Sequence, residues 1–257
     1  MNRFKFGRNW KEYLDSVGEQ DIQAASQDLS KFLGKGSLRG LSFLDIGCGS
    51  GIHSLAARRL GASQIVSLDY DAMAVDCVRS LIERDGHPES WRAFRWDVLS
   101  TAPFPEPAAF DIVYAWGVLH HTGHMWAAID HSLPRVKPGG LFFLALYNKH
   151  WTSPYWKIIK RTYCMSPKWM QNIWLELYAA WESTKEPIRH RLTGVSPRRA
   201  RGMKWRQDLR DWLGGYPYEY ASAPDVIAFM ASRQFTLVRS ALNTGTGCSE
   251  FLFSRTA

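Results

Sequence analysis

Three glycines at every second position follow a short apolar run and an acidic residue. The stretch reads Leu44-Asp45-Ile46-Gly47-Cys48-Gly49-Ser50-Gly51 and leads into a helical pattern. Glycines in such a turn let the backbone bend tightly and let a ligand approach it closely. A second acid, Asp69, ends the next apolar run, where a carboxylate can accept both hydroxyls of a ribose. This order of features predicts a site for a nucleoside-containing cofactor.

Two other interpretations of this stretch fit less well. A glycine turn without a ligand does not explain why strand, glycines, helix and second acid follow in order. A dinucleotide-binding loop has the pattern G-x-G-x-x-G, whereas here the third glycine comes one residue early and Asp45 would repel a pyrophosphate. An acid at that place instead suits the positive ammonium and sulfonium groups of S-adenosylmethionine (SAM). We therefore expect SAM, and not NAD, as the ligand.

Paired histidines follow the fourth apolar run of the chain. Histidine ionises near pH ~6.5, so His121, or His120 beside it, could act as a general base toward an O–H or N–H group. Tyr147, which ends the fifth apolar run, is a further candidate. In the alternative interpretation one histidine packs against the turn, the other shapes the pocket, and Tyr147 is a partly buried aromatic residue. The catalytic candidates are thus His121, His120 and Tyr147, with His121 preferred.

The elements that must position these residues alternate between strand and helix. Apolar runs predict strands over residues 42–46, 64–68, 93–96, 110–116, 141–147, 236–242 and 249–254, and helical patterns predict helices over 10–33, 53–60, 72–85, 126–136 and 223–232. Strands that alternate with helices form βαβ units with a mostly parallel sheet. The fold class predicted is α/β, a doubly wound, mostly parallel, seven-stranded Rossmann-like sheet.

One segment carries nearly all of the positive charge. Residues 148–215 hold 14 Lys/Arg and 5 Asp/Glu, a balance of +9, and 7 of the 12 tryptophans. This shift in composition marks a boundary on each side. Its own pattern predicts a helix that starts at Ser166-Pro167 and ends at Pro187, and another from Ser196-Pro197 to Trp212. We expect a helical cap (1–40), a SAM-binding core (41–147), a basic, tryptophan-rich helical insertion (148–215) and the closing helix and strands of the core (216–257).

The cysteines and the apolar runs indicate in which cellular compartment to expect the protein. The four cysteines are scattered, without the spacing of a metal site or a CxxC pair, so we expect reduced thiols, no metal and a cytoplasmic protein. The polar and aromatic beginning, residues 1–10, does not have the pattern of a signal peptide. The run over 141–147 is far too short to span a bilayer.

The motifs together resemble those of class I SAM-dependent methyltransferases, and within this family the cofactor half resembles the ubiquinone and menaquinone type. The glycine stretch resembles their first motif, and Asp69 matches their ribose-binding acid. Asp97-Val98 resembles the motif that contacts adenine, residues 115–121 the segment that lines the methyl-transfer pocket, and 137–141 the turn before the fifth strand. The resemblance covers roughly residues 40–147. It implies that SAM is bound by Asp45, Gly47, Cys48, Gly49, Gly51, Asp69, Tyr70, Asp97, Val98 and Trp116.

The long insertion departs from the ubiquinone and menaquinone type, so we do not expect this chain to share the substrate of that type. An insertion after the fifth strand, rich in cations and indoles, favours a small-molecule acceptor that is anionic, aromatic or both. We expect acceptor contacts from Trp10, Arg201, Trp205, Tyr218 and Glu219. Other interpretations stay open: peripheral contact with a membrane or a partner protein, an RNA- or protein-directed methyltransferase, and a scaffold protein that binds SAM without catalysis. Nucleic acid is disfavoured because the sequence has no appended RNA-binding motif. The sequence leaves the acceptor atom and the oligomeric state open.

Overall fold

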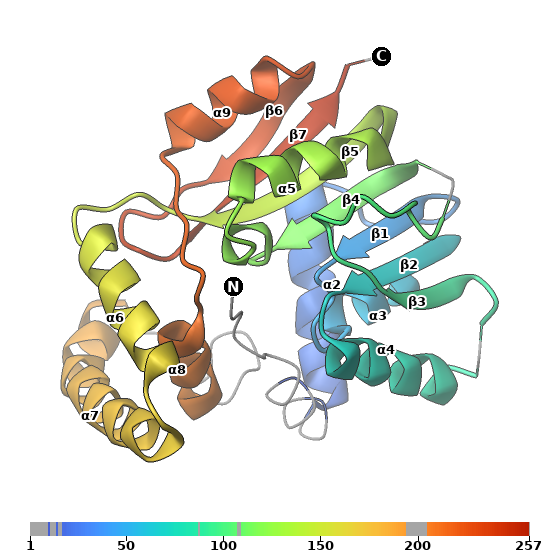
Figure 1. Cartoon of the computed structure of the whole chain (residues 1–257). Coiled ribbons are helices and arrows are strands. Elements are labelled where there is room, and N and C mark those ends of the chain that lie inside the picture. The colour runs from blue at the N-terminus through green and yellow to red at the C-terminus, as the bar shows by residue number, and fades with distance from the viewer. Residues whose placement is uncertain are drawn as a thin grey trace.

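A twisted sheet of seven strands forms the centre of the computed structural model (Figure 1). The structure describes residues 10, 14, 17–86, 88–106, 109–193 and 205–256. The strands are β1 (Ser42–Ile46), β2 (Gln64–Asp69), β3 (Trp91–Arg95), β4 (Phe110–Trp116), β5 (Val136–Tyr147), β6 (Phe235–Ala241) and β7 (Cys248–Arg255). They lie in the order β3-β2-β1-β4-β5-β7-β6, and β7 alone runs antiparallel to its two neighbours. The predicted α/β fold is confirmed.

This strand order creates a place for a ligand. The chain moves outward from β1 to β2 and β3, then returns to the other side of β1 with β4 and β5. In such sheets ligands bind outside the carboxyl ends of the strands, where the order reverses. The glycine stretch follows β1, and the paired histidines follow β4, which is the neighbour of β1. Two motifs that are about 70 residues apart in the chain are therefore brought to one edge of the sheet.

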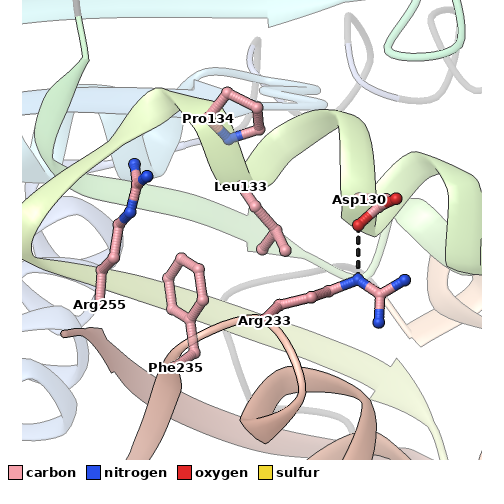
Figure 2. A pocket seen from close by; sticks show the side chains of 6 residues that line it. All are labelled: Asp130, Leu133, Pro134, Arg233, Phe235 and Arg255. Atoms are coloured by element: carbon pink, nitrogen blue, oxygen red, sulfur yellow. Dashed lines mark hydrogen bonds and ion pairs between the residues drawn. The ribbon is translucent and has the colours of Figure 1, made fainter.

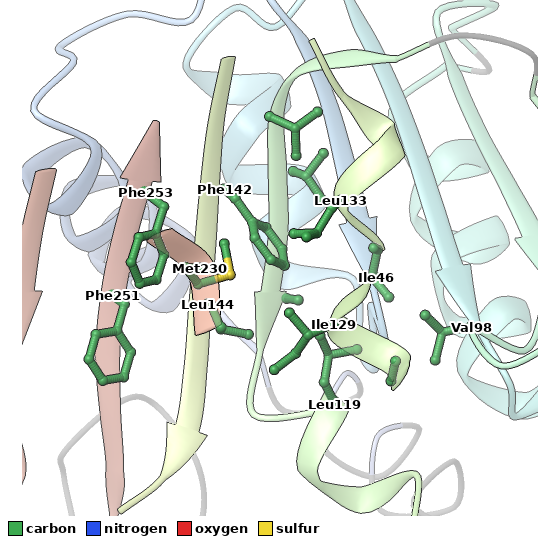
Figure 3. Packing of buried hydrophobic residues seen from close by; sticks show 14 of the residues in the cluster. Ile46, Val98, Leu119, Ile129, Leu133, Phe142, Leu144, Met230, Phe251 and Phe253 are labelled. Carbon is green, nitrogen blue, oxygen red and sulfur yellow. The ribbon is translucent and has the colours of Figure 1, made fainter. Parts of the chain in front are cut away.

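Helices cover both faces of the sheet because neighbouring residues of each strand point to opposite sides. One face packs on α2 (Glu19–Leu33), α3 (Ile52–Arg59) and α4 (Ala72–Arg84), through Phe43 and Ile65. The other packs on α5 (Met125–Ser132) and α9 (Ala223–Ala231), through Leu44 and Val66. In Figure 3, Phe142 and Leu144 of β5 lie beside Met230 of α9 and Ile129 of α5. These two apolar cores hold the strand ends in fixed positions.

Three further helices form a lobe beside the carboxyl ends of the strands (Figure 1): α6 (Ser153–Met165), α7 (Lys168–Thr193) and α8 (Trp205–Gly214). They share a small core of their own, with Tyr163, Leu175 and Leu209 at its centre. Among the described residues, no helix is long and apolar enough to cross a membrane. The short 3-10 helices η1 (Leu119–His121) and η2 (Leu133–Arg135) precede and follow α5 in the chain.

The structure differs from the predicted elements at several boundaries, and three of these differences have a clear physical cause. The helix predicted over 10–33 is interrupted, because Gly18 is extended and donates its N–H to the Asp21 carboxylate (2.9 Å), which starts α2 at Glu19. β5 begins at Val136 and not at residue 141, since a bulge between Phe110 and Ile112 of β4 accommodates the intervening turn residues. α7 continues past Pro187 to Thr193, because proline removes one hydrogen bond of a helix without necessarily ending it.

Candidate active site

The glycine loop between β1 and α3 depends on conformations that other residues rarely adopt. Gly47, Gly49 and Gly51 have φ angles of 75°, 54° and 81°. A Cβ atom on Gly47 would lie only 2.2 Å from Cγ2 of Val118, which directly precedes η1. One on Gly49 would lie 2.9 Å from Cε2 of Trp10. The loop thus contacts both the turn that carries the paired histidines and the ring of Trp10.

Asp69 stands beside this loop at the end of β2. Its Oδ2 accepts the N–H of Gly49 (3.0 Å), and its Oδ1 accepts the N–H of Asp71 (2.8 Å). Burial raises the pKa of Asp69 to about 6, although these hydrogen bonds oppose the change. Each carboxylate oxygen has more than one lone pair, so the group can hold the loop and still accept hydroxyl groups. This geometry fits a ribose diol.

Asp45 is buried under the loop in a chain of hydrogen bonds. Trp91 Nε1 donates to Ser67 Oγ (3.0 Å), Ser67 and Ser54 pair at 2.7 Å, and Ser54 Oγ donates to Asp45 Oδ2 (2.6 Å). Each group in this series donates toward Asp45, so the carboxylate of Asp45 is the final acceptor of the hydrogen-bond network. Burial, together with the charge of Asp69, raises the pKa of Asp45 to about 7, although the hydrogen bond from Ser54 opposes the change. A cation bound nearby would favour its ionised form.

The other cofactor residues expected from the sequence surround the same edge. Asp97 lies in the loop after β3 and accepts the N–H of Leu99 (3.0 Å), while Tyr70 is exposed next to Asp69. Trp116 ends β4, and its Nε1 donates to Oε1 of Glu250 on β7 (2.8 Å). Sequence reasoning did not single out Glu250, because only the pairing of β7 with β5 brings it near.

Six side chains meet at the carboxyl ends of β4 and β5, and we call them the histidine–aromatic cluster: His120, His121, Tyr147, Lys160, Trp212 and Tyr218. The rings of His120 and Tyr147 are 4.0 Å apart, and those of Tyr147 and Tyr218 are 5.0 Å apart. His120, Lys160 and Tyr218 are fully buried, whereas His121, Tyr147 and Trp212 are partly exposed. The cluster therefore has a dry floor and a rim that reaches the surface.

Both histidines of the cluster are held in the neutral form. Nδ1 of His121 lies 2.7 Å from the carbonyl oxygen of Pro217, so Nδ1 carries the proton and Nε2 is the acceptor nitrogen. Burial lowers the pKa of His121 to about 3 and that of His120 well below its usual value. The charge of the nearby Lys160 contributes to lowering the pKa of both histidines. The sequence favoured a histidine that titrates near neutrality, and this environment does not provide one.

Lys160 and Trp212 of the insertion are additions that sequence reasoning missed. The pattern that could have identified Lys160 is a row of residues at helical spacing: Ser153, Trp156, Lys160 and Tyr163. This row places Lys160 on the inner face of α6. Trp212 likewise lies on the inward side of α8, against Tyr147 and Trp156. α6 was not among the predicted helices, so the inward position of Lys160 could not be inferred.

The five expected acceptor residues are not all brought together. Tyr218 belongs to the cluster, and Trp10 lies on the glycine loop. Glu219 accepts the N–H of Met125 with both carboxylate oxygens (3.0 and 3.2 Å), which caps the start of α5. Trp205 begins α8, and Arg201 lies outside the described residues. The structure thus associates Tyr218 with the candidate acceptor site and Trp10 with the cofactor loop.

A shallow hollow lies at the opposite edge of the sheet (Figure 2), lined by Asp130, Leu133, Pro134, Arg233, Phe235 and Arg255. Its two arginines are engaged: Arg233 pairs with Asp130 (2.5 Å), and Arg255 donates to the carbonyl oxygen of Val136 (2.6 Å). The hollow sits where β5 and β6 begin. Since ligands of open α/β sheets bind at the carboxyl ends of the strands, this hollow is not the candidate site.

Comparison with known proteins finds similarity to methyltransferases. A family model described as a methyltransferase domain matches residues 17–235. The ubiquinone biosynthesis O-methyltransferase of Methylobacterium sp. (strain 4-46) is 33% identical over 117 residues, which are 46% of this chain and 45% of that protein. The chain spans about half the length of the curated relatives it matches.

Two solved structures share the fold. Magnesium protoporphyrin IX methyltransferase from Synechocystis PCC 6803, with bound SAH, matches with a TM-score of 0.58 and 15% identity, over 97% of this chain and 94% of that one. The 1,6-didemethyltoxoflavin-N1-methyltransferase of Burkholderia thailandensis matches with a TM-score of 0.52 and 15% identity, over 93% of this chain and 80% of that one. At such low identity the likeness concerns the fold.

Proposed function

Because this chain belongs to the methyltransferase-domain family and is a SAM-dependent methyltransferase, we propose that it methylates a small aromatic acceptor with an acidic group, held in the histidine–aromatic cluster. The observation that carries this proposal is the position of the cluster. Its histidine turn touches the cofactor loop through Val118 and Gly47, and its rings come from both the sheet and the insertion. An acceptor among these rings would lie next to the cofactor.

The residues around the glycine loop fit SAM. Asp69 has the lone pairs to accept the ribose hydroxyls, and the positive φ angles of the loop glycines let the backbone turn tightly beside it. Asp45, whose ionised form a nearby cation would favour, suits the ammonium group. We assign Asp97, Val98 and Tyr70 to the adenosine side and Trp116 to the side of the methyl group. When bound, SAM supplies a methyl group on a positively charged sulfur.

The cluster would contribute orientation and the exclusion of water. Flat rings at 4–6 Å from one another favour an aromatic acceptor, because stacked and edge-on contacts stabilise such rings. The fully buried His120 and Tyr218 keep water from the floor. The ring of His121, held by the Pro217 carbonyl, forms part of the rim against which the acceptor would lie. Holding the reacting atom in one orientation is a main source of catalysis in displacement reactions.

The decisive experiment is identification of the product. Purified protein is incubated with SAM that carries a labelled methyl group and with the small-molecule fraction of a host extract, and labelled products are isolated. We expect a labelled aromatic compound with an ionisable group. Label in RNA or protein, when these fractions are supplied instead, would contradict the proposal, and so would the absence of any labelled product.

Asp69→Ala should lower the affinity for SAM by about 10- to 150-fold, because one or two hydrogen bonds of roughly 1.5–3 kcal/mol in total are lost. Calorimetric titration measures the change, and NAD should give no heat with either protein. Asp71→Ala is a matched control, since the Asp71 side chain accepts the N–H of Met73 and caps the start of α4. An unchanged affinity in Asp69→Ala would place the ribose elsewhere.

We also propose that the outer face of the insertion contacts a membrane surface. Tyr155 and Ile158 of α6 and Trp169, Ile173 and Leu177 of α7 are all exposed. Lys157, Arg161 and Lys168 are exposed on the same helices. Apolar side chains next to cations are the combination that binds anionic lipid surfaces. Such contact would bring the enzyme to acceptors that partition into lipid.

Sedimentation with lipid vesicles tests this contact. We expect binding to vesicles that contain phosphatidylserine, and weaker binding to pure phosphatidylcholine. The double variant Trp169→Ser/Leu177→Ser should lose this binding, because it removes two of the exposed apolar side chains, while its SAM affinity stays unchanged. Val238→Ser, on an exposed apolar residue of β6, is the control. If the wild type binds neither vesicle, or the double variant instead turns a dimer into a monomer, the face is not a membrane surface.

A further inference from the structure

A lysine is fully buried inside the insertion, against the histidine–aromatic cluster. Nζ of Lys160 lies 3.9 Å from the ring centre of Trp212, 5.0 Å from that of Tyr218 and 5.5 Å from that of Tyr147. It also donates a hydrogen bond to the backbone carbonyl of Trp212, near the end of α8. The carbonyls at a helix end and the faces of aromatic rings both favour a positive charge. The site can therefore hold an ammonium group away from water.

The surroundings contain no full ionic partner for this lysine among the described residues. Burial lowers the pKa of Lys160 to about 7, and the partial opposing effects come from Cys164, Cys248 and Asp211. His120 and His121 also lie near Lys160, and burial keeps both neutral. Tyr147 and Tyr218 also face it, and burial raises the pKa of both hydroxyls. The ionisable groups near enough to interact electrostatically with Lys160 are Cys164, Cys248, Asp211, His120 and His121, and the rings of Tyr147 and Tyr218 lie beside it.

We propose that Lys160 recognises an acidic hydroxyl of the aromatic acceptor, takes its proton and holds the resulting oxyanion. This inference rests on the proposed function and identifies the group that would select the substrate: a phenol or enol on a flat ring. The O–H bond breaks with its electron pair left on oxygen, and the proton forms a new N–H bond on Nζ. No other reactant is needed. The three rings and the Trp212 carbonyl then stabilise the ammonium that forms.

The position of the cluster supports this role over a purely structural one. A lysine that only joined α6 to α8 would need the hydrogen bond to the Trp212 carbonyl, but not the three rings or the two neutral histidines around it. The two histidines are weak bases here, because burial disfavours their charged forms. Among the described residues of the cluster, Lys160 is the one whose ionisation falls in the neutral range, as a general base requires.

The test uses 7-hydroxy-4-methylcoumarin, a phenol that ionises near neutral pH and whose absorbance changes when it does. The full-length protein is saturated with S-adenosylhomocysteine, the probe is added, and its ionisation is followed between about pH 5.5 and 9. In the wild type the pKa of the bound probe should fall by about one unit or more, a tenfold change in its ionisation constant. Lys160→Met should bind the probe with its pKa unchanged or raised, because an apolar site disfavours the phenolate.

Lys149→Met is the matched control, since Lys149 lies shortly before α6 and is exposed. It should behave as the wild type, and Lys160→Arg, which keeps a cation, should still lower the pKa of the probe. The inference fails if the wild type does not bind the probe, if the pKa of the bound probe does not fall, or if Lys160→Met lowers it as much as the wild type. If Lys160→Met also keeps the wild-type kcat/KM for the acceptor found in the extract, Lys160 is excluded while the proposed function stands.

Discussion

Gly47→Ala is expected to weaken SAM binding by about 30- to 5,000-fold. The new Cβ would lie 2.2 Å from Val118 Cγ2, and the backbone φ of 75° disfavours any side chain. A left-handed conformation costs roughly 1–2 kcal/mol and an overpacked contact about 1–3 kcal/mol. The clash can be relieved only by moving the glycine loop or the histidine turn, and both line the proposed site. Calorimetric titration with SAM measures the loss.

Gly139→Ala separates the clash from the backbone strain. Gly139 has a φ of 72°, nearly that of Gly47, but nothing lies within 4 Å of the position of its Cβ. We expect it to lower the free energy of unfolding by about 1 kcal/mol and to leave the affinity for SAM at the wild-type level. In the double variant Gly47→Ala/Val118→Gly the clash is absent, so much of the affinity should return. Equal affinities of Gly47→Ala and wild type would show that the loop does not bind the cofactor.

His121→Ala is expected to lower turnover by up to about 10²-fold, through lost orientation of the acceptor, while the affinity for SAM stays near that of the wild type. The imidazole is held by the Pro217 carbonyl with Nε2 as its acceptor nitrogen, at the rim of the cluster. Its removal would take away a ring of the rim that helps to orient the acceptor. Steady-state kinetics with the identified acceptor, together with titration of SAM, measures both quantities.

The pH dependence of the same reaction distinguishes the roles of His121 and Lys160. Because burial lowers the pKa of His121 to about 3, its neutral form is present throughout the neutral range. A rise of kcat/KM with pH near 7 is therefore expected from deprotonation of Lys160, and it should persist in His121→Ala. His131→Ala is the control for loss of a histidine, since His131 Nδ1 pairs with the Val98 carbonyl (3.1 Å) away from the cluster. Full activity of His121→Ala would remove this residue from catalysis.

The fold was largely predictable because its patterns are local. A run such as Phe110–Trp116 is apolar over its whole length, and each glycine or proline that interrupts a pattern is visible in the chain. The predicted boundaries were wrong where specific contacts, and not the periodicity of the segment, decide where an element begins or ends. Gly18 interrupts a periodic helix, and the bulge in β4 brings the turn before β5 into the sheet. Neither can be inferred from the periodicity of one segment.

The residues proposed to bind the cofactor could also be predicted from the sequence. Gly47, Gly49, Gly51 and Asp69 lie within two consecutive strand–turn units, and the register of β1 on β2 brings them together. Local order therefore suffices to predict SAM at this loop. The alternation of strands and helices likewise determined that further ligand-binding residues would follow β4 and β5.

Only the tertiary structure decided the composition of the acceptor side. Lys160, Trp212 and Tyr218 are separated from the paired histidines by about 40 to 100 residues of the chain, and their meeting depends on how the helices of the insertion pack. The same packing reversed the expectation for the histidines. Their type predicts ionisation near neutral pH, but burial beside a lysine lowers their pKa and leaves Lys160 as the group that titrates there. A pKa depends on the surroundings of a group, and these surroundings come from distant parts of the sequence.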